Sequence, residues 1–327
     1  MKKGQRVTIK DVAKMAKVTP QTVSRAFRNT HDISEKTRER ILKIASQMGY
    51  VKNSSATSLR CGASKQVAVV YDNLRNCYFS IMTDFLQRCL KDCNYTTLAI
   101  SVQDTHFTEE AYLSAVAHNV DGIISFLEPS EEIAELVKNY NVPVLLFGRR
   151  TDVENVDFIQ MDNVTAGTLA AERFLSAHCK NPLLITEALE ITCAYDRYCG
   201  FLEPFQKVGI QPKLHVNPLG DYLRVEPALL ALYQEGTFPD AIFCFNDMIA
   251  FEVLYVVEKN HLPTPKVIGV DDIQQEIYFP KRLTTVGSNK KLMASKAVAM
   301  LIARMQGKRS VVSSNNEQVF LVEGETA

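Results

Sequence analysis

Apolar residues recur at helical spacing in three short segments near the start of the chain. Each segment follows a residue type that commonly caps a helix: Thr8, Thr19 and Ser34. Pro20 follows Thr19, and proline at the first helical position starts a helix sharply. The pattern predicts three short helices around a common core, with these inward residues: Ile9, Val12, Ala13 and Ala16, then Val23, Ala26 and Phe27, then Ile41, Ile44, Ala45 and Met48.

Beyond about residue 66, short and nearly continuous apolar runs alternate with amphipathic segments of helical length, such as 78–93 and 166–178. Buried strands separated by helices indicate parallel sheets that are covered by helices on both faces. Some 260 residues is long for one such sheet, so an α/β fold with two lobes is predicted. The expected strands are residues 67–71, 96–102, 122–127, 142–148, 182–186, 213–216, 241–245 and 266–270.

The composition, with 46% hydrophobic and 23% charged residues, is typical of a soluble globular protein. No apolar run reaches the roughly 18 residues of a membrane helix, and the basic N-terminus lacks the apolar stretch of a secretory signal. The eight cysteines include no C-x-x-C pair and are scattered as reduced thiols would be. We therefore expect a cytoplasmic bacterial protein without membrane contact.

The charge distribution separates the helical segments from the rest of the chain. Residues 1–65 hold 15 Lys and Arg against 4 Asp and Glu, a net charge of +11, whereas the whole chain is neutral. A basic terminal module indicates nucleic acid or anionic lipid as its partner. A solvated basic tail is the alternative, but a tail would not show helical periodicity.

The second predicted helix carries many hydrogen-bonding side chains for its length. Its core side takes Val23, Ala26 and Phe27, which leaves four polar residues outside: Gln21, Ser24, Arg25 and Arg28. Gln and Arg can read adenine and guanine edges in the major groove, as the second helix of a helix-turn-helix does. Each residue alone also fits an ordinary surface helix. Side chains at or near helix N-termini are candidates for phosphate contacts: Thr8, Thr19, Thr22 and Ser34.

The segment VTIKDVAKMAKVTPQTVSRAFRN…ISEKTRERILKIASQMGY closely resembles the DNA-binding headpiece of the LacI/GalR family of bacterial transcription regulators. In that family, two residues at the start of the second helix and a later Arg read bases. The resemblance places these roles on Pro20, Gln21 and Arg25. Pro20 departs from members that have a base-reading side chain there, so the operator half-site is expected to differ.

Residues 53–62, NSSATSLRCG, resemble the family segment that becomes helical only on DNA and inserts a paired Leu into the minor groove. The resemblance assigns this role to Asn53, Ala56 and Leu59. A short Ser-rich segment is too weak a helix to persist alone. A plain flexible linker is the alternative that composition alone favours.

The rest of the chain resembles the family's effector domain, which is similar to periplasmic sugar-binding proteins. Eight motifs appear in family order: VAVVYDNLRNCYF, VDGIISF, VPVLLFGRR, MDNVTAG, DRYCGF, PDAIFCFNDMIAF, VIGVDDI and RLTTV. The expected organisation is a helix-turn-helix domain (1–52), a hinge and linker (53–65), and an effector-binding and dimerisation domain (66–327) with one lobe formed by 66–161 and 289–318 and the other by 162–288 and 319–327.

Polar residues directly follow two predicted strands: Asn246 and Asp247 follow AIFCF, and Asp271 and Asp272 follow KVIGV. Ligands bind beyond the carboxyl ends of parallel strands, and amides and carboxylates bond to sugar hydroxyls. Helix capping is an equally good interpretation of Asp247 and Asp272. Asp162, in MDN, is a further polar candidate.

The resemblance adds further candidates for effector contacts. Arg197 in DRYCG matches the family's main sugar-contacting residue, although a structural ion pair is the alternative. Tyr222 falls where some members place a ring against the sugar, and Asn76, Phe79 and Arg149 complete the expected site. Gly148 stands where many members have Asp, and residues 187–195 depart from the usual glycine-containing loop. Both departures leave the identity of the effector open.

Catalytic and metal-binding motifs are missing from the sequence. Cys89 and Cys93 lie one helical turn apart, but without a nearby His pair they are better explained by packing. The sequence contains no H-x-x-x-H, G-x-S-x-G, phosphate-binding loop or G-x-G-x-x-G. We therefore expect no enzymatic activity, no cofactor and no metal.

The sequence predicts a transcription regulator, most simply a repressor, that binds a near-palindromic DNA operator as a homodimer under the control of a small effector, most simply a sugar. Whether the effector releases or promotes DNA binding, and whether the regulator also activates, is left open. Purine or protein coeffectors, and a DNA-binding protein without small-molecule control, are the alternatives. A solute-binding protein of a transporter fits less well, because it would not need a basic headpiece.

Overall fold

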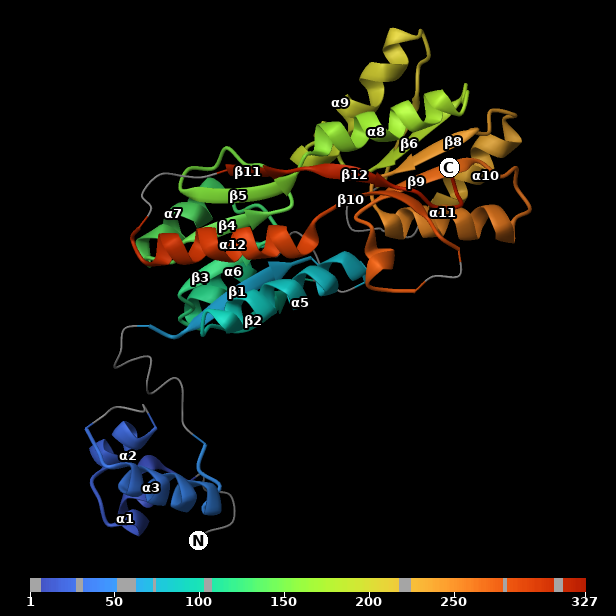
Figure 1. The fold of residues 1–327 in the computed structure, drawn as a ribbon. Helices are drawn as coiled ribbons and strands as arrows, with labels where there is room; N and C mark the ends of the chain where they lie inside the picture. The colour runs from blue at the N-terminus through green and yellow to red at the C-terminus, as the bar shows by residue number, and fades with distance from the viewer. Residues whose placement is uncertain are drawn as a thin grey trace. The chain divides into compact units, whose positions relative to one another are not determined.

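The chain separates into two compact units, residues 1–64 and 65–327 (Figure 1). The computed structural model describes residues 7–27, 32–51, 63–72, 75–102, 108–217, 225–278, 281–308 and 314–327.

The first unit contains the three helices that the hydrophobic pattern predicts. They are α1 (Ile9–Ala16), α2 (Pro20–Ala26) and α3 (Glu35–Gln47). Their shared core is closed to solvent at Val12, Val23, Ala26 and Ile41. Lys17, with φ of 53°, takes the left-handed conformation that ends α1 and turns the chain towards α2.

The second unit contains two six-stranded sheets within the described residues, one in each of two lobes (Figure 1). The first lobe's sheet has the spatial order β11 (Ser314–Glu317), β5 (Val156–Met161), β4 (Val144–Phe147), β3 (Gly122–Ser125), β1 (Gln66–Tyr71) and β2 (Thr96–Ser101). The second lobe's sheet has the order β12 (Val319–Val322), β10 (Thr284–Ser288), β9 (Lys266–Val270), β8 (Ala241–Cys244), β6 (Pro182–Thr186) and β7 (Lys213–Val216). Neighbouring strands are parallel, except that β12 runs antiparallel to β10.

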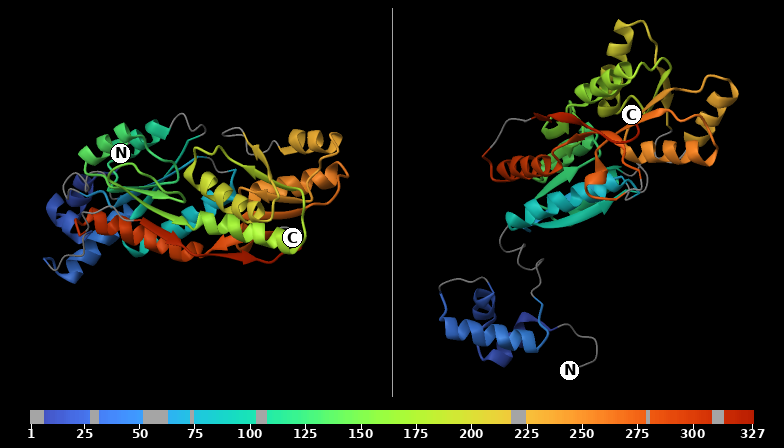
Figure 2. Two further views of the ribbon diagram at one scale, coloured as in Figure 1. Left: turned by 90° about the horizontal axis from the view of Figure 1, so that it is seen from above. Right: turned by 45° about the vertical axis from the view of Figure 1, so that its right-hand side comes forward.

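Helices cover both faces of each sheet, as the apolar strands predicted (Figure 2). Alternate strand residues point to opposite faces, so Val67 and Val69 pack with one pair of helices and Ala68 and Val70 with the other. In the first lobe the pairs are α5 (Cys77–Asp92) with α12 (Lys290–Met305), and α6 (Thr108–Ala117) with α7 (Glu131–Asn139). In the second lobe they are α8 (Asn163–Ser176) with α9 (Thr192–Lys207), and α10 (Val225–Gln234) with α11 (Asp247–Lys259).

The chain passes between the lobes three times: from β5 to α8, from β10 to α12, and from β11 to β12. The last pass leads into a segment that closes the second sheet. Thr326 donates its hydroxyl to the carbonyl of Val267 at 2.7 Å and accepts the backbone N–H of Thr284 at 2.9 Å. The C-terminal residues are therefore an integral part of the second lobe.

The sequence did not anticipate every strand. Residues 182–186, 213–216 and 266–270 form strands with the expected bounds. The expected strand 67–71 ends at the expected residue and begins one residue earlier, at Gln66. The strands expected at 96–102, 122–127, 142–148 and 241–245 end sooner. Strands β5, β10, β11 and β12 were not expected; β11 reads SNNE, which carries no apolar signal. None of the helices that the structure describes is long and apolar enough to span a membrane.

Candidate functional site

The outer surface of α2 presents the predicted base-reading residues. Val23 and Ala26 are fully buried, whereas Pro20, Gln21 and Arg25 are exposed, and Ser24 is half-buried. The C-terminal end of α2 is held by Arg38 of α3, whose Nε donates to the carbonyl oxygen of Ala26 at 3.3 Å. One rigid helix face therefore offers an amide and a guanidinium to a partner.

Three of the four predicted phosphate-contacting side chains, those of Thr8, Thr19 and Ser34, act as helix caps within the first unit, and the Thr22 hydroxyl bonds to that of Thr19 at 2.9 Å. Thr8 and Asp11 form a reciprocal capping box, in which the N–H of Thr8 donates to Asp11 at 2.8 Å. Thr19 accepts the N–H of Thr22 at 3.2 Å, and Ser34 accepts the N–H of Thr37 at 3.4 Å. These side chains thus define the three helix N-termini in the free protein.

Five predicted site residues lie outside the described residues. They are Arg28 of the expected base-reading set, the hinge residues Asn53, Ala56 and Leu59, and the effector candidate Tyr222.

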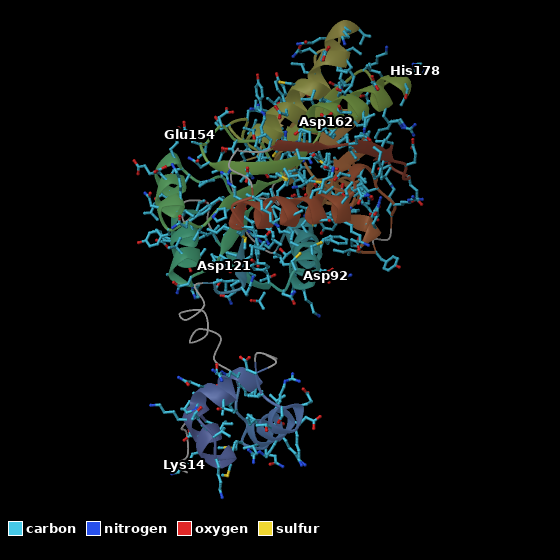
Figure 3. All side chains as sticks on the ribbon, turned by 60° about the vertical axis from the view of Figure 1, so that its left-hand side comes forward. Lys14, Asp92, Asp121, Glu154, Asp162 and His178 are labelled. Carbon is cyan, nitrogen blue, oxygen red and sulfur yellow. The ribbon has the colours of Figure 1, made fainter. Side chains whose placement is uncertain are left out.

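In the second unit, three effector candidates cap helices. The N–H of Tyr78 donates to Asn76 Oδ1 at 3.0 Å, and the N–H of Ile249 donates to Asn246 Oδ1 at 2.9 Å. Asp162 accepts the N–H of Thr165 at 3.0 Å and begins α8 beside the chain's first pass between the lobes (Figure 3). For these three residues the capping role is present in the structure.

The carboxylates of Asp247, Asp271 and Asp272 are used in different ways. Asp247 is buried and accepts the N–H of Ile273 at 2.9 Å and the hydroxyl of Thr285 at 2.5 Å, so it joins α11 to the 3-10 helix Ile273–Gln275 and to β10. Asp272 is fully buried and binds the side-chain amide of Gln275. The carboxylate of Asp271 has no hydrogen-bond partner in the described part of the chain, although the residue is only 7% exposed. Burial raises the pKa of Asp271 to about 7, and Arg197 and Lys290 oppose that rise.

Arg197 of α9 is held rigidly at the lobe boundary. Its Nε donates to Asn163 Oδ1 at 2.9 Å, and its Nη1 donates to the carbonyl oxygen of Phe245. The guanidinium also lies over the Phe245 ring, 4.5 Å from the ring centroid. Among the described residues, no carboxylate forms an ion pair with the Arg197 guanidinium. The structural ion pair considered as an alternative for Arg197 is therefore not seen in that part of the chain.

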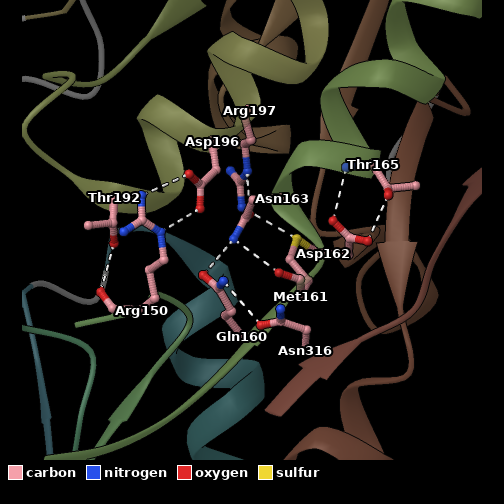
Figure 4. A network of polar contacts seen from close by, with 10 residues as sticks. All are labelled: Arg150, Gln160, Met161, Asp162, Asn163, Thr165, Thr192, Asp196, Arg197 and Asn316. Carbon is pink, nitrogen blue, oxygen red and sulfur yellow. Dashed lines mark hydrogen bonds and ion pairs between the residues drawn. The ribbon is translucent and has the colours of Figure 1, made fainter. Parts of the chain in front are cut away.

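The Arg197 contact continues into the strands that connect the lobes (Figure 4). Asn163 donates its amide to Gln160 Oε1 and to the Met161 carbonyl, both at 3.1 Å. Gln160 in turn donates to Asn316 Oδ1 of β11 at 3.2 Å. A chain of side-chain hydrogen bonds therefore runs from Arg197 to two of the three passes between the lobes.

A second contact joins the lobes directly (Figure 4). Arg150, which follows β4 of the first lobe, donates through Nε and Nη2 to the two carboxylate oxygens of Asp196 on α9, each at 3.1 Å. The Thr192 hydroxyl donates to the Arg150 carbonyl oxygen at 2.8 Å. The hydrogen bonds to Asp196 raise the pKa of Arg150.

Aromatic side chains of the first lobe face this boundary. Phe79 packs edge-on against Tyr78 and Phe126, with ring centroids 6.1 and 5.2 Å apart. The pKa of Tyr78 is raised by burial and responds to Asp271 and Arg197 of the second lobe. Tyr78 of the first lobe therefore lies near these charged groups of the second lobe.

Glu187 is a buried acid that the sequence interpretation did not select. It follows β6 and is 5% exposed, and no described residue hydrogen-bonds its carboxyl. Burial raises the pKa of Glu187 to about 7; nearby Asp72 adds to the rise and Arg149 opposes it. Asp72 follows β1 and Arg149 follows β4, so the groups around Glu187 come from the other lobe.

The signal that would have found Glu187 and Asp72 was present in the sequence. Each directly follows an apolar strand, as Asn246 and Asp271 do. Asn163, Arg150 and Asp196 carry no comparable signal, because their roles depend on contacts between segments far apart in the chain.

Comparisons with known proteins agree with this architecture. The profile described as periplasmic binding proteins and sugar binding domain of LacI family matches residues 64–319, and that of bacterial regulatory proteins, lacI family, matches residues 8–53. The HTH-type transcriptional repressor PurR of Aliivibrio fischeri is 28% identical over 318 residues, covering 92% of each chain.

Two solved structures share the fold. A lac repressor dimer bound to operator and the anti-inducer ONPF has a TM-score of 0.83 at 21% identity, covering 98% of this chain and 99% of that chain. The transcriptional regulator CelR in complex with cellobiose has a TM-score of 0.69 at 20% identity, covering 98% and 100%. Since one family profile spans most of the chain and a second matches the three-helix unit, the chain belongs to the lacI family of bacterial regulatory proteins.

Proposed function

We propose that this family member is a DNA-binding transcriptional repressor that acts as a homodimer under the control of a small effector. The observation that carries the proposal is the surface of α2, which buries Val23 and Ala26 and exposes Pro20, Gln21 and Arg25. Exposed amide and guanidinium groups on a capped helix suit base edges in the major groove. Two such helices in a dimer read a near-palindromic operator.

The effector is proposed to bind between the two lobes, where Arg197 and Asp271 of one lobe face Tyr78 of the other. The other residues proposed to line this site are Phe79, Arg149 and the helix-capping residues Asn76, Asp162 and Asn246. The link from Arg197 through Asn163 to Gln160 and Asn316 supports coupling between the effector and the relative position of the lobes. If effector binding changes the affinity of the protein for DNA, then DNA binding changes its affinity for the effector by the same factor. The residues 53–65, as hinge and linker, would carry that change to the DNA-binding unit.

We propose a sugar or sugar derivative as the effector class. The family description names sugar binding, and the CelR structure contains cellobiose. Charged and amide groups opposite aromatic rings supply hydrogen bonds to hydroxyls and contact with the apolar face of a sugar ring. A purine is the second class, favoured by the same group of rings, on which a flat heterocycle can stack.

The test of DNA binding starts from duplexes that the full-length protein selects from a random-sequence pool. Arg25→Ala should lower affinity for the selected duplex and relax its discrimination against substitutions by about 1–3 kcal/mol at one base pair of each half-site. Lys43→Ala, which removes an exposed positive charge from α3, is the matched control and should leave discrimination intact. Unchanged discrimination in Arg25→Ala would remove α2 as the recognition helix.

A further inference from the structure

Lys290 is a cation buried at one of the passes between the lobes. It is the first residue of α12, directly after the chain leaves β10, and it is only 5% exposed. Its ammonium donates to the carbonyl oxygen of Asp271 at 3.0 Å and to that of Asp272 at 2.8 Å. Among the residues that the structure describes, no carboxylate forms an ion pair with this ammonium. Its partners are therefore two backbone carbonyls of the second lobe.

The needs of α12 do not explain a lysine at this position. A positive charge at the N-terminus of a helix opposes the helix dipole. Asn289 already caps α12, because its side chain accepts the N–H of Leu292 at 2.9 Å. Taking an ammonium out of water is costly, and two neutral carbonyls replace only part of its hydration. The reason for Lys290 must therefore lie in the two residues that it binds.

Asp271 and Asp272 have an unusual backbone, with φ angles of 108° and 50° in a region that L side chains rarely adopt. Such a backbone persists only where its surroundings hold it. The N–H of Asp271 donates to the carbonyl oxygen of Val286 at 2.9 Å. The N–H of Asp272 donates to the Thr285 hydroxyl at 3.4 Å. Lys290 binds both carbonyls, so it completes the set of backbone bonds that holds this strained turn.

The turn lies where the two lobes meet. The 3-10 helix Ile273–Gln275, which follows the turn, lies against α5 of the first lobe. Helix α12, which begins at Lys290, packs on the sheet of the first lobe through Met293 and Ala297. One ammonium therefore joins a strained turn of the second lobe to a helix of the first.

We propose that Lys290 is a positioning residue for the effector response. Its ammonium fixes the backbone of Asp271, and with it the direction of the carboxylate that the proposed function places at the effector site. The same two bonds connect the turn to the start of α12. A displacement of the turn by an effector is then passed to the first lobe, and a rearrangement of the first lobe on DNA is passed back to the turn. The inference rests on the proposed function, whose two sites it connects.

Hydrogen exchange of the full-length protein, followed by mass spectrometry, measures both ends of this connection without an effector. Lys290→Met removes the ammonium and keeps an unbranched side chain. Amides of residues 270–277 and 290–294 should then exchange about ten-fold faster, because two hydrogen bonds to a charged group are lost. Lys290→Arg keeps a cation with several N–H donors and should retain most of the protection. Lys291→Met removes the neighbouring exposed charge and should exchange as the wild type does.

The second part of the experiment uses the selected DNA duplex as the probe. In the wild type, saturation with this duplex should change the exchange rate of residues 270–277 about three-fold or more, because linkage acts in both directions. Lys290→Met should lose this change although the duplex still saturates it, and Lys291→Met should keep it. A residue that only stabilises the fold would lower protection and leave the response to the duplex in place.

Several results would overturn the role of Lys290: wild-type exchange in Lys290→Met, faster exchange at only one of the two segments, Lys290→Arg exchanging as fast as Lys290→Met, or a duplex response that survives Lys290→Met. If Lys290→Met shows no melting transition, Lys290→Gln takes its place with the same expected results, since its amide is one bond shorter and uncharged.

The two proposals fail in different ways. A protein that selects a duplex but shows no change at residues 270–277 keeps the proposed function and loses the connection through Lys290. A protein for which no duplex can be selected loses the proposed function and the effector role of Lys290 with it. Exchange of the free protein then still decides whether Lys290 holds the strained turn.

Discussion

Arg150 of the first lobe and Asp196 of the second face each other through two parallel hydrogen bonds of 3.1 Å. Asp196 directly precedes Arg197, which binds Asn163 at the start of α8. The ion pair that joins the lobes and the guanidinium proposed to meet the effector are thus set by the same turn of α9. We therefore expect closure of the lobes and the orientation of Arg197 to be coupled.

Removal of the Arg150–Asp196 pair should favour separation of the lobes. The Arg150 side chain is 38% exposed, so solvent weakens the pair, and a double-mutant cycle with Arg150→Ala and Asp196→Ala should give a coupling free energy of about 1 kcal/mol. Small-angle X-ray scattering without ligand should show a larger radius of gyration for either single variant. The Arg88–Asp84 pair, at 2.7 Å within α5, is the control whose removal should leave the radius unchanged. Equal radii for all variants would show that the pair does not hold the lobes.

Arg197→Ala should abolish the response to effector while leaving effector-free DNA binding within a few-fold of wild type. The substitution removes the groups that bind Asn163 and Phe245, and it removes one of the two cations that oppose the raised pKa of Asp271. Arg197→Lys keeps the positive charge but loses the planar guanidinium with its several N–H donors. We therefore expect this variant to lose most of the response to effector as well. The measurement is duplex affinity by fluorescence anisotropy, with and without the best ligand found by calorimetry.

The control for that experiment is Arg173→Ala on α8, which pairs at the surface with Glu323. It should respond as the wild type does. A normal response in Arg197→Ala would move the effector site away from this residue.

Stability should depend on pH through Glu187. Its pKa is raised to about 7 from an ordinary value of 4.5, so between these values the folded chain holds a proton that the unfolded chain has released. The stabilisation is present below pH 4.5 and is lost as pH rises through 7. Between pH 5 and 8, wild type should lose up to about 2.5 kcal/mol of unfolding free energy relative to Glu187→Gln.

Calorimetric melting temperatures of the two proteins, taken across that pH range, test this dependence. Asp271 is present in both proteins, so its own raised pKa cancels in the comparison. The exposed Glu190→Gln variant should follow the wild type. Parallel curves for wild type and Glu187→Gln would contradict a buried, protonated Glu187.

The caps of the first unit should contribute to its stability individually. Ser34→Ala removes the acceptor of the Thr37 N–H at the start of α3 and should cost about 1 kcal/mol, whereas Ser34→Gly should cost only a few tenths. Amide hydrogen exchange of α3 within the full-length protein measures this local loss. Equal protection in Ser34→Ala would show that the hydroxyl does not stabilise the helix.

DNA binding should be strongly salt-dependent if the basic first unit makes the contacts. Each phosphate contact contributes a slope of about −0.9 to log affinity against log salt concentration, so a dimer with about six contacts gives a slope near −5. Anisotropy titrations between 50 and 200 mM salt provide the slope. A slope shallower than about −2 would exclude residues 1–64, with their concentration of positive charge, as the DNA-binding surface.

Local signals predicted the first unit well. Thr8, Thr19 and Ser34 begin their helices as expected, because a cap depends only on neighbours three residues away. The two-lobed α/β fold also followed from local patterns, since buried strands are apolar whatever their partners. Strand β11 could not be found this way, because its pairing with β5 depends on residues more than 150 positions earlier.

The effector side of the site was harder to predict for the same reason. A polar residue after a strand either caps the next helix or faces a ligand, and only the three-dimensional contacts separate Asn246, which caps α11, from Asp271, whose carboxylate has no described partner. Glu187 carries the same local signal directly after β6, and only the structure shows that it does not cap the following helix, α9. Asp196 was passed over because its partner, Arg150, lies 46 positions away.

The late return of the chain through both lobes has a consequence for synthesis on the ribosome. β11 completes the edge of the first sheet, and β12 with Thr326 completes the second, so each lobe lacks a strand until residues 314–326 have emerged. The DNA-binding unit, in contrast, needs only local contacts and is available about 250 residues earlier. A nascent chain therefore carries a finished DNA-binding unit before the second unit, proposed to regulate it, can fold.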